Sequence, residues 1–422
     1  MNTLRYGNGE LELPDDWRSA EVIAGEEPPP LPDPAPAIAG ALARPLGSPS
    51  LASFVEPGDR VVVVVPDATR YAAPELVVPA VLEAVRRAGA SSVEIRIANG
   101  THRRSTDEEL ERLAGGVRDV PVGDRDCDDP AAHEALGRTG HLGIVRVDRA
   151  VARADKLVLV GAVSFHYLAG FGGGGKLLAP GCADRATALA IHRRCLADPG
   201  PGRHVHARPA QLEGNPLQEA IAGVLALAPP AFLVQLALQR GRRPAGIFAG
   251  DPREAHLAAA AFHRRWQARP IGPPADLVVA SAGGMPWDLN LYQAHKALEA
   301  ACRAVRPGGT VVLAAACPEG AGSAAFADSL AWPTPDEHEA ALRARFSVAG
   351  HTALALRRKT AAARCILVAD GIDERLARGL GFELAHDFAE ARALAGAAAR
   401  TLVLPDGART LPLADGPTAA AP

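Results

Sequence analysis

The chain has 422 residues, of which 48% are hydrophobic and 22% charged, and its formal net charge is −3. This length favours two domains, and the composition is typical of a globular protein rather than a disordered or fibrous one. The charge balance argues against a nucleic-acid partner and no apolar run reaches the roughly 18 residues of a membrane span, so we expect a cytoplasmic protein with neither partner.

An α/β domain is predicted over residues 1–270. After a short strand pair and a proline-rich lead-in, the nearly continuous β-branched run Arg60–Val65 is typical of a strand buried on both faces. Helical spacing over Pro74–Ala88 and a strand at Ser92–Ala98 complete a βαβ unit. The alternation continues with helices near Thr106–Leu113, Ala186–Cys195, Pro216–Leu225 and Pro252–Ala268, and strands near Ile144–Val147, Lys156–Val163, Phe232–Leu238 and Ala245–Ala249. A mainly parallel sheet flanked by helices follows.

A second, smaller α/β domain is predicted over residues 275–422. A buried strand at Asp276–Ser281 leads into a long helix over Asn290–Val305. Further strands, with helices between them, are expected at Thr310–Ala315, Cys365–Ala369 and Thr401–Leu404. This domain is also expected to hold a mainly parallel sheet flanked by helices. The pattern leaves open whether its last strand packs back on the first domain, and residues after Leu413 are predicted to form a frayed tail.

Polar clusters follow the predicted strands, at the carboxyl ends where open α/β sheets bind ligands. The first contains Asp67, Thr69 and Arg70. Arg70 is suited to hold a carboxylate and Asp67 to accept from a sugar hydroxyl, but an ordinary strand-to-helix turn explains the cluster equally well. The second contains His102, which is either a general base, since histidine titrates near neutral pH, or a loop residue without a role.

A third cluster is the segment Phe165–Lys176, which contains four successive glycines. Because glycine lets a backbone approach a ligand closely, we interpret the segment as a binding loop, with Gly173, Gly174 and Gly175 at the ligand. It is not a phosphate-binding loop of the GxxxxGK[ST] type, because Leu177 follows the lysine.

Two nitrogen donors belong to this region. Lys176 is a phosphate contact, a covalent attachment point or a solvated surface lysine. His192 falls on a predicted helix sixteen residues further on, where a lone histidine is usually structural. Neither residue decides a function by itself.

A fourth cluster opens the long helix of the second domain. Gln293 and Lys296 are three residues apart, so they share a helical face near the amino terminus, where the helix dipole favours an anion. The alternative is a solvated face with an extended lysine.

Together these motifs resemble the lactate racemase family. In chain order they read DxTR, NGTHR, FHYxAGFGGGGK, a histidine sixteen residues after the lysine, and GGxPxDxNxYQAxK. The resemblance extends over residues 61–296 and the layout of the C-terminal domain. It implies a racemase or epimerase that acts on a small 2-hydroxy acid in the cleft between the two domains.

The resemblance also implies a cofactor. This is a nickel-pincer nucleotide, a pyridinium-3,5-bisthiocarboxylic acid mononucleotide that holds Ni(II) and is attached covalently at Lys176. His192 would be the fourth nickel ligand, and Asp67 and Thr69 would contact the nucleotide. Cofactor biosynthesis enzymes are then implied partners, whereas the oligomeric state is left undetermined.

The remaining site residues match family positions one by one. His102 and His166 match a pair of catalytic acid/base histidines that serve reversible hydride transfer. Arg70 matches a substrate-holding position in the first domain. In the second domain the positions that match substrate contacts are Tyr292, Gln293 and Lys296.

The sequence departs from the family pattern at two places. The loop has only glycines where members often carry a serine and an arginine, and Gly350–Thr352 occupies the stretch where some members have a tryptophan. Both differences favour a hydroxy acid that is larger than lactate or differently substituted. The alternatives are a sugar-acid epimerase with the same cofactor, a non-catalytic nickel- or nucleotide-binding protein, and a dehydrogenase, which lacks its GxGxxG motif here.

Overall fold

The structure is a computed structural model that describes residues 1–419, and these residues form two compact units. The N-terminal unit comprises residues 27–197 and 203–266, and the C-terminal unit comprises residues 1–26, 198–202 and the chain from Gln267 onward. Residues 1–26 were expected in the N-terminal domain, which was predicted over residues 1–270, but they belong to the C-terminal unit. They join the C-terminal unit because β3 (Glu21–Val22) pairs in parallel with β19 (Thr401–Leu404) at the edge of its sheet.

The N-terminal unit is built on one six-stranded sheet with the strand order β13-β12-β9-β4-β5-β6. Its strands are β4 (Arg60–Pro66), β5 (Ser92–Ala98), β6 (Val122–Gly123), β9 (Lys156–Ala162), β12 (Ala231–Leu238) and β13 (Pro244–Gly250). Its helices are α2 (Pro34–Ala43), α3 (Leu51–Phe54), α4 (Pro74–Arg87), α5 (Asp107–Leu113), α6 (Arg149–Arg153), α7 (Arg185–Arg193), α8 (Pro216–Leu225) and α9 (Pro252–Gln267). All neighbouring pairs are parallel except β12 and β13, so the predicted mainly parallel sheet is confirmed.

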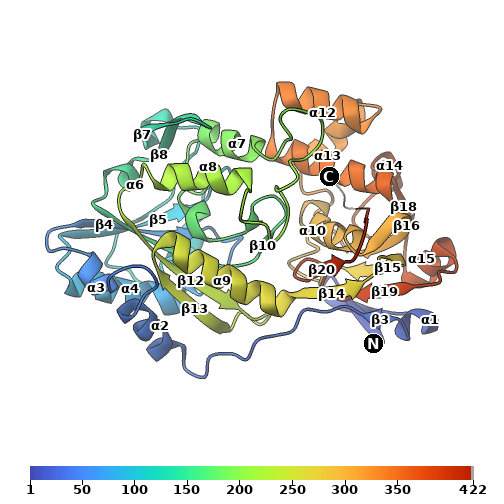
Figure 1. Cartoon of the computed structure of the whole chain (residues 1–422), viewed down its shortest axis with the longest axis horizontal. Helices are drawn as coiled ribbons and strands as arrows, with labels where there is room; N and C mark the ends of the chain where they lie inside the picture. The colour runs from blue at the N-terminus through green and yellow to red at the C-terminus, as the bar shows by residue number, and fades with distance from the viewer. Residues whose placement is uncertain (420–422) are drawn as a thin grey trace. The chain divides into compact units, whose positions relative to one another are not determined.

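Both faces of this sheet are covered, as the run of five valines in β4 predicts. Val61, Val63 and Val65 point to the side covered by α2, α3 and α4, whereas Val62 and Val64 point to the side of α6, α7 and α8. Figure 1 shows these two helical layers on opposite sides of the strands. Each valine is at most 2% exposed. Burial of a valine side chain contributes about 1.5–3 kcal/mol, so the alternation fixes the register of β4 firmly.

Two short strand pairings of this unit lie outside this sheet. The strand predicted near Ile144–Val147 is β8 (Gly143–Asp148), which pairs antiparallel with β7 (His133–Thr139) in a separate hairpin. A smaller pair joins β10 (Phe165–His166) to β11 (Gly170–Phe171), directly before the glycine run. The short helices η1 (Pro130–Ala132) and η2 (Gly174–Leu177) complete the unit.

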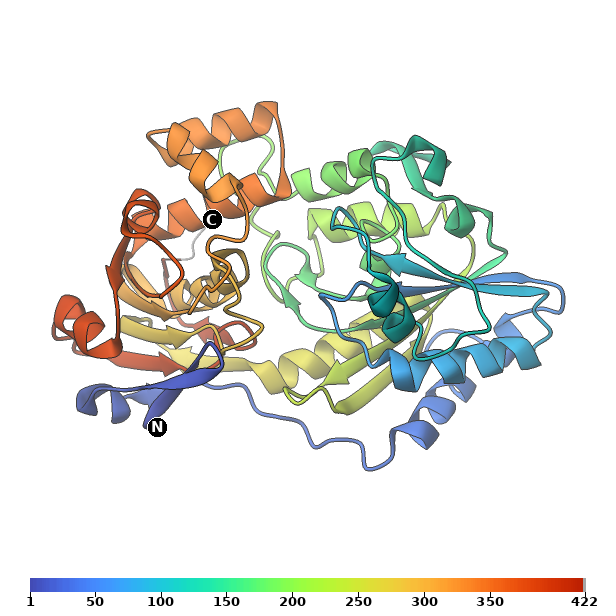
Figure 2. The ribbon, with the colours of Figure 1, turned by 180° about the vertical axis from the view of Figure 1, so that it is seen from behind.

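The C-terminal unit has its own six-stranded parallel sheet, with the order β18-β17-β16-β15-β19-β3. The strands of this sheet not yet given are β15 (Ala275–Ser281), β16 (Val305–Ala314), β17 (Arg364–Val368) and β18 (Phe382–Ala385). Two separate strand pairs join β1 (Thr3–Tyr6) to β2 (Gly9–Glu12) and β14 (Ala268–Gly272) to β20 (Leu411–Ala414). Its helices are α1 (Asp15–Arg18), α10 (Leu291–Cys302), α11 (Ala325–Asp328), η3 (Ser329–Ala331), α12 (Pro335–Ala344), α13 (Val348–Ala362), α14 (Glu374–Gly379) and α15 (Phe388–Ala395). One face packs against α10 and α13, and the other against α15 and the β1–β2 hairpin (Figure 2).

The end of the chain is more ordered than the expected frayed tail. Strand β20 pairs in parallel with β14, within the C-terminal unit. Beyond it, the Ala419 side chain is 5% exposed and its backbone N–H donates to the Val305 carbonyl at 3.0 Å. The expectation of a free tail is therefore wrong as far as Ala419, and residues 420–422 lie outside the described part of the chain. Within residues 1–419, no helix combines the length and apolarity needed to cross a bilayer.

A buried ion pair supports α10 from α13. Lys359 Nζ lies 2.8 Å from Glu299 Oε2, and both side chains are at most 6% exposed. Glu299 also contacts Arg303 at 3.2 Å. Removal of one partner of a buried pair leaves an uncompensated charge, which is strongly destabilising.

We therefore expect Glu299→Gln to lower the free energy of unfolding of the C-terminal unit by about 3 kcal/mol. Urea unfolding monitored by hydrogen exchange of α10 measures the loss. The control is the double variant Glu299→Leu, Lys359→Met, which removes both charges and is expected to lose much less. Equal losses in the two proteins would show that packing, not charge, explains the effect.

Candidate active site

The polar clusters of the N-terminal unit converge because three parallel strands are neighbours. Strands β9, β4 and β5 lie side by side in this order and end at the same edge of the sheet. Asp67 directly follows β4, His102 lies four residues beyond β5, and His166 follows β9 in the short strand β10. The sheet therefore brings these clusters to one edge, where a ligand site is expected.

Asp67 and His102 form a carboxylate–imidazole pair at this edge. Asp67 Oδ2 lies 2.5 Å from His102 Nδ1, while Oδ1 accepts from the Thr69 backbone N–H at 2.9 Å and from its hydroxyl at 2.6 Å. Asp67 is 7% exposed, whereas the His102 side chain is 46% exposed. Because a carboxylate only accepts, Nδ1 carries a proton, and in the neutral form of the ring the lone pair is on Nε2.

The protonation of Asp67 follows from this pairing. Burial acts to raise the pKa of its carboxyl, but the His102 hydrogen bond and charge and the Thr69 bond outweigh burial, so the pKa is lowered overall. Asp67 is therefore ionised at neutral pH and holds the His102 ring in one tautomer. The resemblance assigned Asp67 and Thr69 to the nucleotide, whereas in the structure Asp67 bonds both Thr69 and His102.

His166 is held in the opposite tautomer. Its Nδ1 accepts from the backbone N–H groups of Leu168 at 3.2 Å and Ala169 at 3.0 Å. A nitrogen that accepts carries no proton, so the neutral ring has its N–H at Nε2. Its ring stacks on Tyr167, with centroids 5.5 Å apart. The two histidines are thus unequal: His102 offers a lone pair at Nε2, and His166 offers a donor there.

The glycine run is packed against its own unit. A Cβ on Gly173 would lie 2.7 Å from Gln235 Nε2, one on Gly174 would lie 2.7 Å from the His256 ring, and one on Gly175 would meet α8 at 2.6 Å. Gly173 and Gly174 also have φ of +81° and +59°, which disfavours side chains. These contacts give the three glycines a packing role within the unit, and their expected place at a ligand stays a prediction.

The packed loop ends in Lys176, at the third position of η2. Burial, together with the smaller effect of the positive charge of Arg70, lowers the pKa of Lys176 to about 7. A large fraction of the amine is therefore neutral near pH 7 and carries a nucleophilic lone pair. This favours the attachment-point interpretation over a solvated surface lysine.

His192 lies on α7, as predicted, and is also neutral. Its Nδ1 donates to the Ala188 carbonyl at 2.8 Å, which leaves the Nε2 lone pair available. Burial lowers the pKa of His192 to about 4, helped by the charges of Lys176, His102 and Arg70. Lys176, His102 and Arg70 therefore all act electrostatically on the His192 ring. A neutral histidine held through its other ring nitrogen is the usual form of a metal ligand.

The predicted residues of the C-terminal unit gather at the start of α10. Lys296 Nζ donates to Gln293 Oε1 at 2.5 Å, as expected for residues on one helical face, and lies 5.4 Å from the Trp287 ring centroid. Tyr292 packs edge-on to Phe326 at 6.5 Å. The side chains of Tyr292, Gln293 and Lys296 are all partly exposed. Sequence reasoning did not single out Trp287, although an aromatic ring in a polar loop was a usable signal.

Two other polar residues of this motif, Asn290 and Asp288, have local structural roles. Asn290 caps α10 by accepting from the Gln293 N–H at 3.1 Å. Asp288 is fully buried and accepts from the Gly7 N–H at 2.6 Å. The motif therefore combines groups that shape the loop with groups that face outward.

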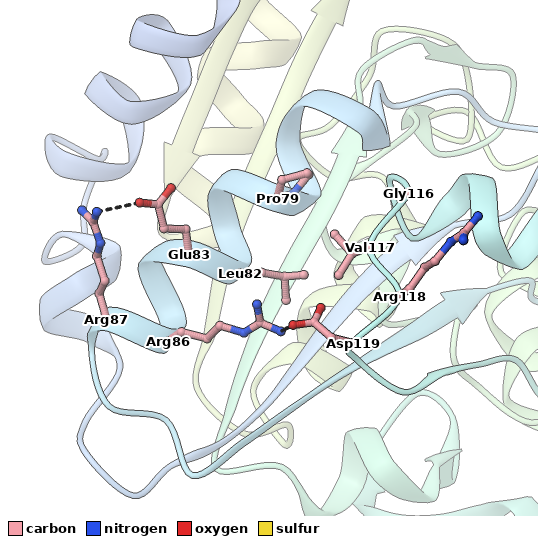
Figure 3. A pocket seen from close by; sticks show the side chains of 9 residues that line it. All are labelled: Pro79, Leu82, Glu83, Arg86, Arg87, Gly116, Val117, Arg118 and Asp119. Atoms are coloured by element: carbon pink, nitrogen blue, oxygen red, sulfur yellow. Dashed lines mark hydrogen bonds and ion pairs between the residues drawn. The ribbon is translucent and has the colours of Figure 1, made fainter.

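A surface hollow of about 570 Å³ lies along the last turns of α4, and none of the candidate residues lines it (Figure 3). Two ion pairs border it, Arg86 with Asp119 at 2.8 Å and Arg87 with Glu83 at 2.7 Å. It is distant in the fold from the carboxyl ends of the strands and adds nothing to the candidate site.

The donor set fits the implied cofactor. A neutral lysine amine suits covalent attachment, and an imidazole Nε2 suits Ni(II), which accepts nitrogen and sulfur donors in planar geometry. Arg70 is exposed on the same unit and supplies a positive charge for a phosphate or carboxylate.

Known proteins match this chain over nearly its whole length. Residues 6–203 match the lactate racemase N-terminal domain and residues 272–411 the lactate racemase C-terminal domain. A lactate racemase from Thermoanaerobacterium thermosaccharolyticum is 30% identical over 290 residues, 68% of this chain and 66% of that protein. One from Lactiplantibacillus plantarum is 28% identical over 394 residues, 87% of this chain and 88% of that protein.

Two solved structures are also similar to this chain in fold. The lactate racemase apoprotein from T. thermosaccharolyticum has a TM-score of 0.88 at 26% identity, covering 98% of this chain and 99% of that one. A protein from Thermotoga maritima shares the fold, with a TM-score of 0.63 at 16% identity over 86% of this chain and 96% of that one. The two-domain α/β fold and these matches define a racemase, an enzyme of the isomerase class. The chain belongs to the lactate racemase family.

The lowered pKa of Lys176 has a measurable consequence. Below about pH 7 the amine is protonated and unreactive, and above it the amine is neutral, so acylation of Lys176 in cofactor-free protein should be half-maximal near pH 7. Brief labelling with acetic anhydride at a series of pH values, read by peptide mass spectrometry, gives this midpoint. The urea-unfolded chain is the control and should show the midpoint of an ordinary lysine. An ordinary midpoint in the folded protein would contradict the burial argument.

Proposed function

We propose that this protein interconverts the stereoisomers of a small 2-hydroxy acid of the lactate type. The observation that carries the proposal is the grouping in one unit of a neutral lysine, a neutral histidine with a free Nε2 lone pair, and a carboxylate-held histidine. The two lactate racemases that the chain resembles support the substrate class. Lactate is therefore the first substrate to test.

The cofactor that fits this set is a nickel-pincer nucleotide. Lys176 would hold it covalently, and His192 Nε2 would complete the nickel coordination. When bound, this group supplies a reversible acceptor for the hydride on C2 of the substrate. Ordinary side chains do not accept hydride, whereas they do transfer protons and position substrates.

The chain's own residues would handle the proton and the carboxylate. His102, held by Asp67, would take the proton of the substrate hydroxyl at Nε2. His166 would donate a hydrogen bond from Nε2 to the C2 oxygen, which is a hydroxyl in the substrate and a carbonyl in the 2-oxo acid. Arg70, Tyr292, Gln293 and Lys296 are the proposed substrate contacts, because a guanidinium and an ammonium suit the carboxylate.

The cofactor assignment is tested on protein co-expressed with cofactor biosynthesis enzymes. Wild type should carry a nickel-bearing mass adduct, and Lys176→Ala should carry neither adduct nor nickel. His192→Ala should keep the organic adduct but lose nickel, because the covalent bond and the metal bond are made by different residues.

Lys296→Ala is the matched lysine control and should keep both adduct and nickel. Intact-mass spectrometry and metal analysis on the same samples give the two readings. A nickel-free, unmodified wild-type chain beside active biosynthesis enzymes would remove the cofactor proposal.

The unequal histidines predict unequal losses of activity. His102→Gln should lower kcat at least about 100-fold, since glutamine cannot take a proton. His166→Gln should lose only about tenfold, because its amide still donates a hydrogen bond. Asp67→Asn should resemble His102→Gln, since the ring loses its fixed tautomer.

Racemisation rates of loaded proteins, followed by chiral chromatography, check this order. Either enantiomer serves as the starting substrate, because enantiomers have equal free energy and kcat/KM must fall equally in both directions. Similar losses at His102 and His166 would favour two equivalent bases, each serving one enantiomer.

A further inference from the structure

Beneath the glycine loop lies a polar pair that the sequence motifs do not include. Gln235 is in the middle of β12 and fully buried, in a strand that is otherwise apolar. Its Oε1 accepts from the Gly174 backbone N–H at 3.0 Å and lies 3.0 Å from His256 Nδ1. Because Oε1 only accepts, the proton of the His256 ring sits on Nδ1.

The other ring nitrogen of His256 is left with a lone pair. His256 is 7% exposed, and among residues 1–419 no polar atom is placed to bond its Nε2. An unpaired buried acceptor is destabilising, because it loses its hydrogen bond to water and gains none in the protein. Such an atom is expected to have a partner in the working protein.

Lys176 is the candidate donor for this position, although its amine does not bond His256 Nε2 in this structure. The His256 ring lies directly against the Cα of Gly174, where a Cβ would be 2.7 Å away, and Lys176 is two residues further along the same short helix. The positive charge of Lys176 acts on the His256 ring: burial and that charge together lower the pKa of His256 to about 4. His256 is therefore neutral and able to accept.

We propose that His256 is a positioning residue for Lys176, whose side-chain nitrogen donates a hydrogen bond to His256 Nε2. Before the cofactor is attached the donor is the amine, and afterwards it is the N–H that remains on the same nitrogen. Gln235 fixes the His256 ring, and the ring directs the lysine nitrogen. This inference deepens the proposed function, since it concerns the residue assigned to hold the cofactor.

The first test uses cofactor-free protein and so does not depend on the proposed function. ¹⁵N spectra of histidine-labelled wild type, with the His256 signals assigned from His256→Gln, should show a protonated Nδ1 and a hydrogen-bonded Nε2. In Lys176→Met, which keeps the side-chain length without a donor, the Nε2 signal should move to the position of a free lone pair. An Nε2 signal that is the same in both proteins would overturn the proposal.

The second test separates hydrogen bonding from packing by matched substitutions. His256→Asn places an amide where Nδ1 was and loses the Nε2 acceptor, whereas His256→Gln places an amide oxygen near Nε2. During co-expression with the biosynthesis enzymes, the initial rate of adduct formation on Lys176 should fall about tenfold in His256→Asn. It should remain close to wild type in His256→Gln.

Thermal unfolding of both variants controls for loss of folding. Equal loading of His256→Asn and wild type would overturn the proposal, as would equal losses in the two folded variants. If wild type forms no adduct, the proposed cofactor fails while the ¹⁵N comparison still decides the role of His256. If His256→Asn does not fold, the same comparison of wild type with Lys176→Met decides it.

Discussion

The parallel pairing of β9, β4 and β5 is the constraint on which the candidate site depends. Because these strands end at one edge, the residues that follow them meet without a long connection. Valines buried on both faces of β4 hold its register, and a shift by one residue would exchange the two faces. The position of Asp67 relative to β5 is thus a consequence of apolar packing some distance away.

A second layer of control comes from polar groups placed within this packing. Gln235 interrupts an apolar strand, and its amide oxygen is shared between the Gly174 N–H and His256. A buried amide is tolerated only when it is bonded, so the loop has few other ways to lie on the sheet. The glycines then follow from the close approach, since Gly173 and Gly174 have no room for a Cβ.

The sequence predicts those parts of the fold that have local patterns. Continuous apolar runs identify the strands of both sheets, and motif spacing identifies Lys176, His192 and His102. Residues 1–26 were misplaced because the pairing of β3 with β19 joins segments almost 400 residues apart, which no local pattern records. The tautomers of His102 and His166 were also beyond prediction, since they depend on Asp67 and on two backbone N–H groups. The glycine run does not decide between packing and ligand approach, because both require the same residue type.

The charges around Lys176 explain why this neighbourhood holds neutral nitrogen atoms. Burial disfavours every cation there, and the charge of Lys176 further lowers the pKa of both His192 and His256. A carboxylate beside these groups would reverse the effect by stabilising their protonated forms. The two carboxylate oxygens of Asp67 bond Thr69 and His102. Its negative charge therefore acts mainly on the exposed His102 ring. The unit thereby combines an exposed carboxylate–histidine pair with histidines whose pKa values are lowered, which is the arrangement that the proposed proton transfer and metal ligation would use.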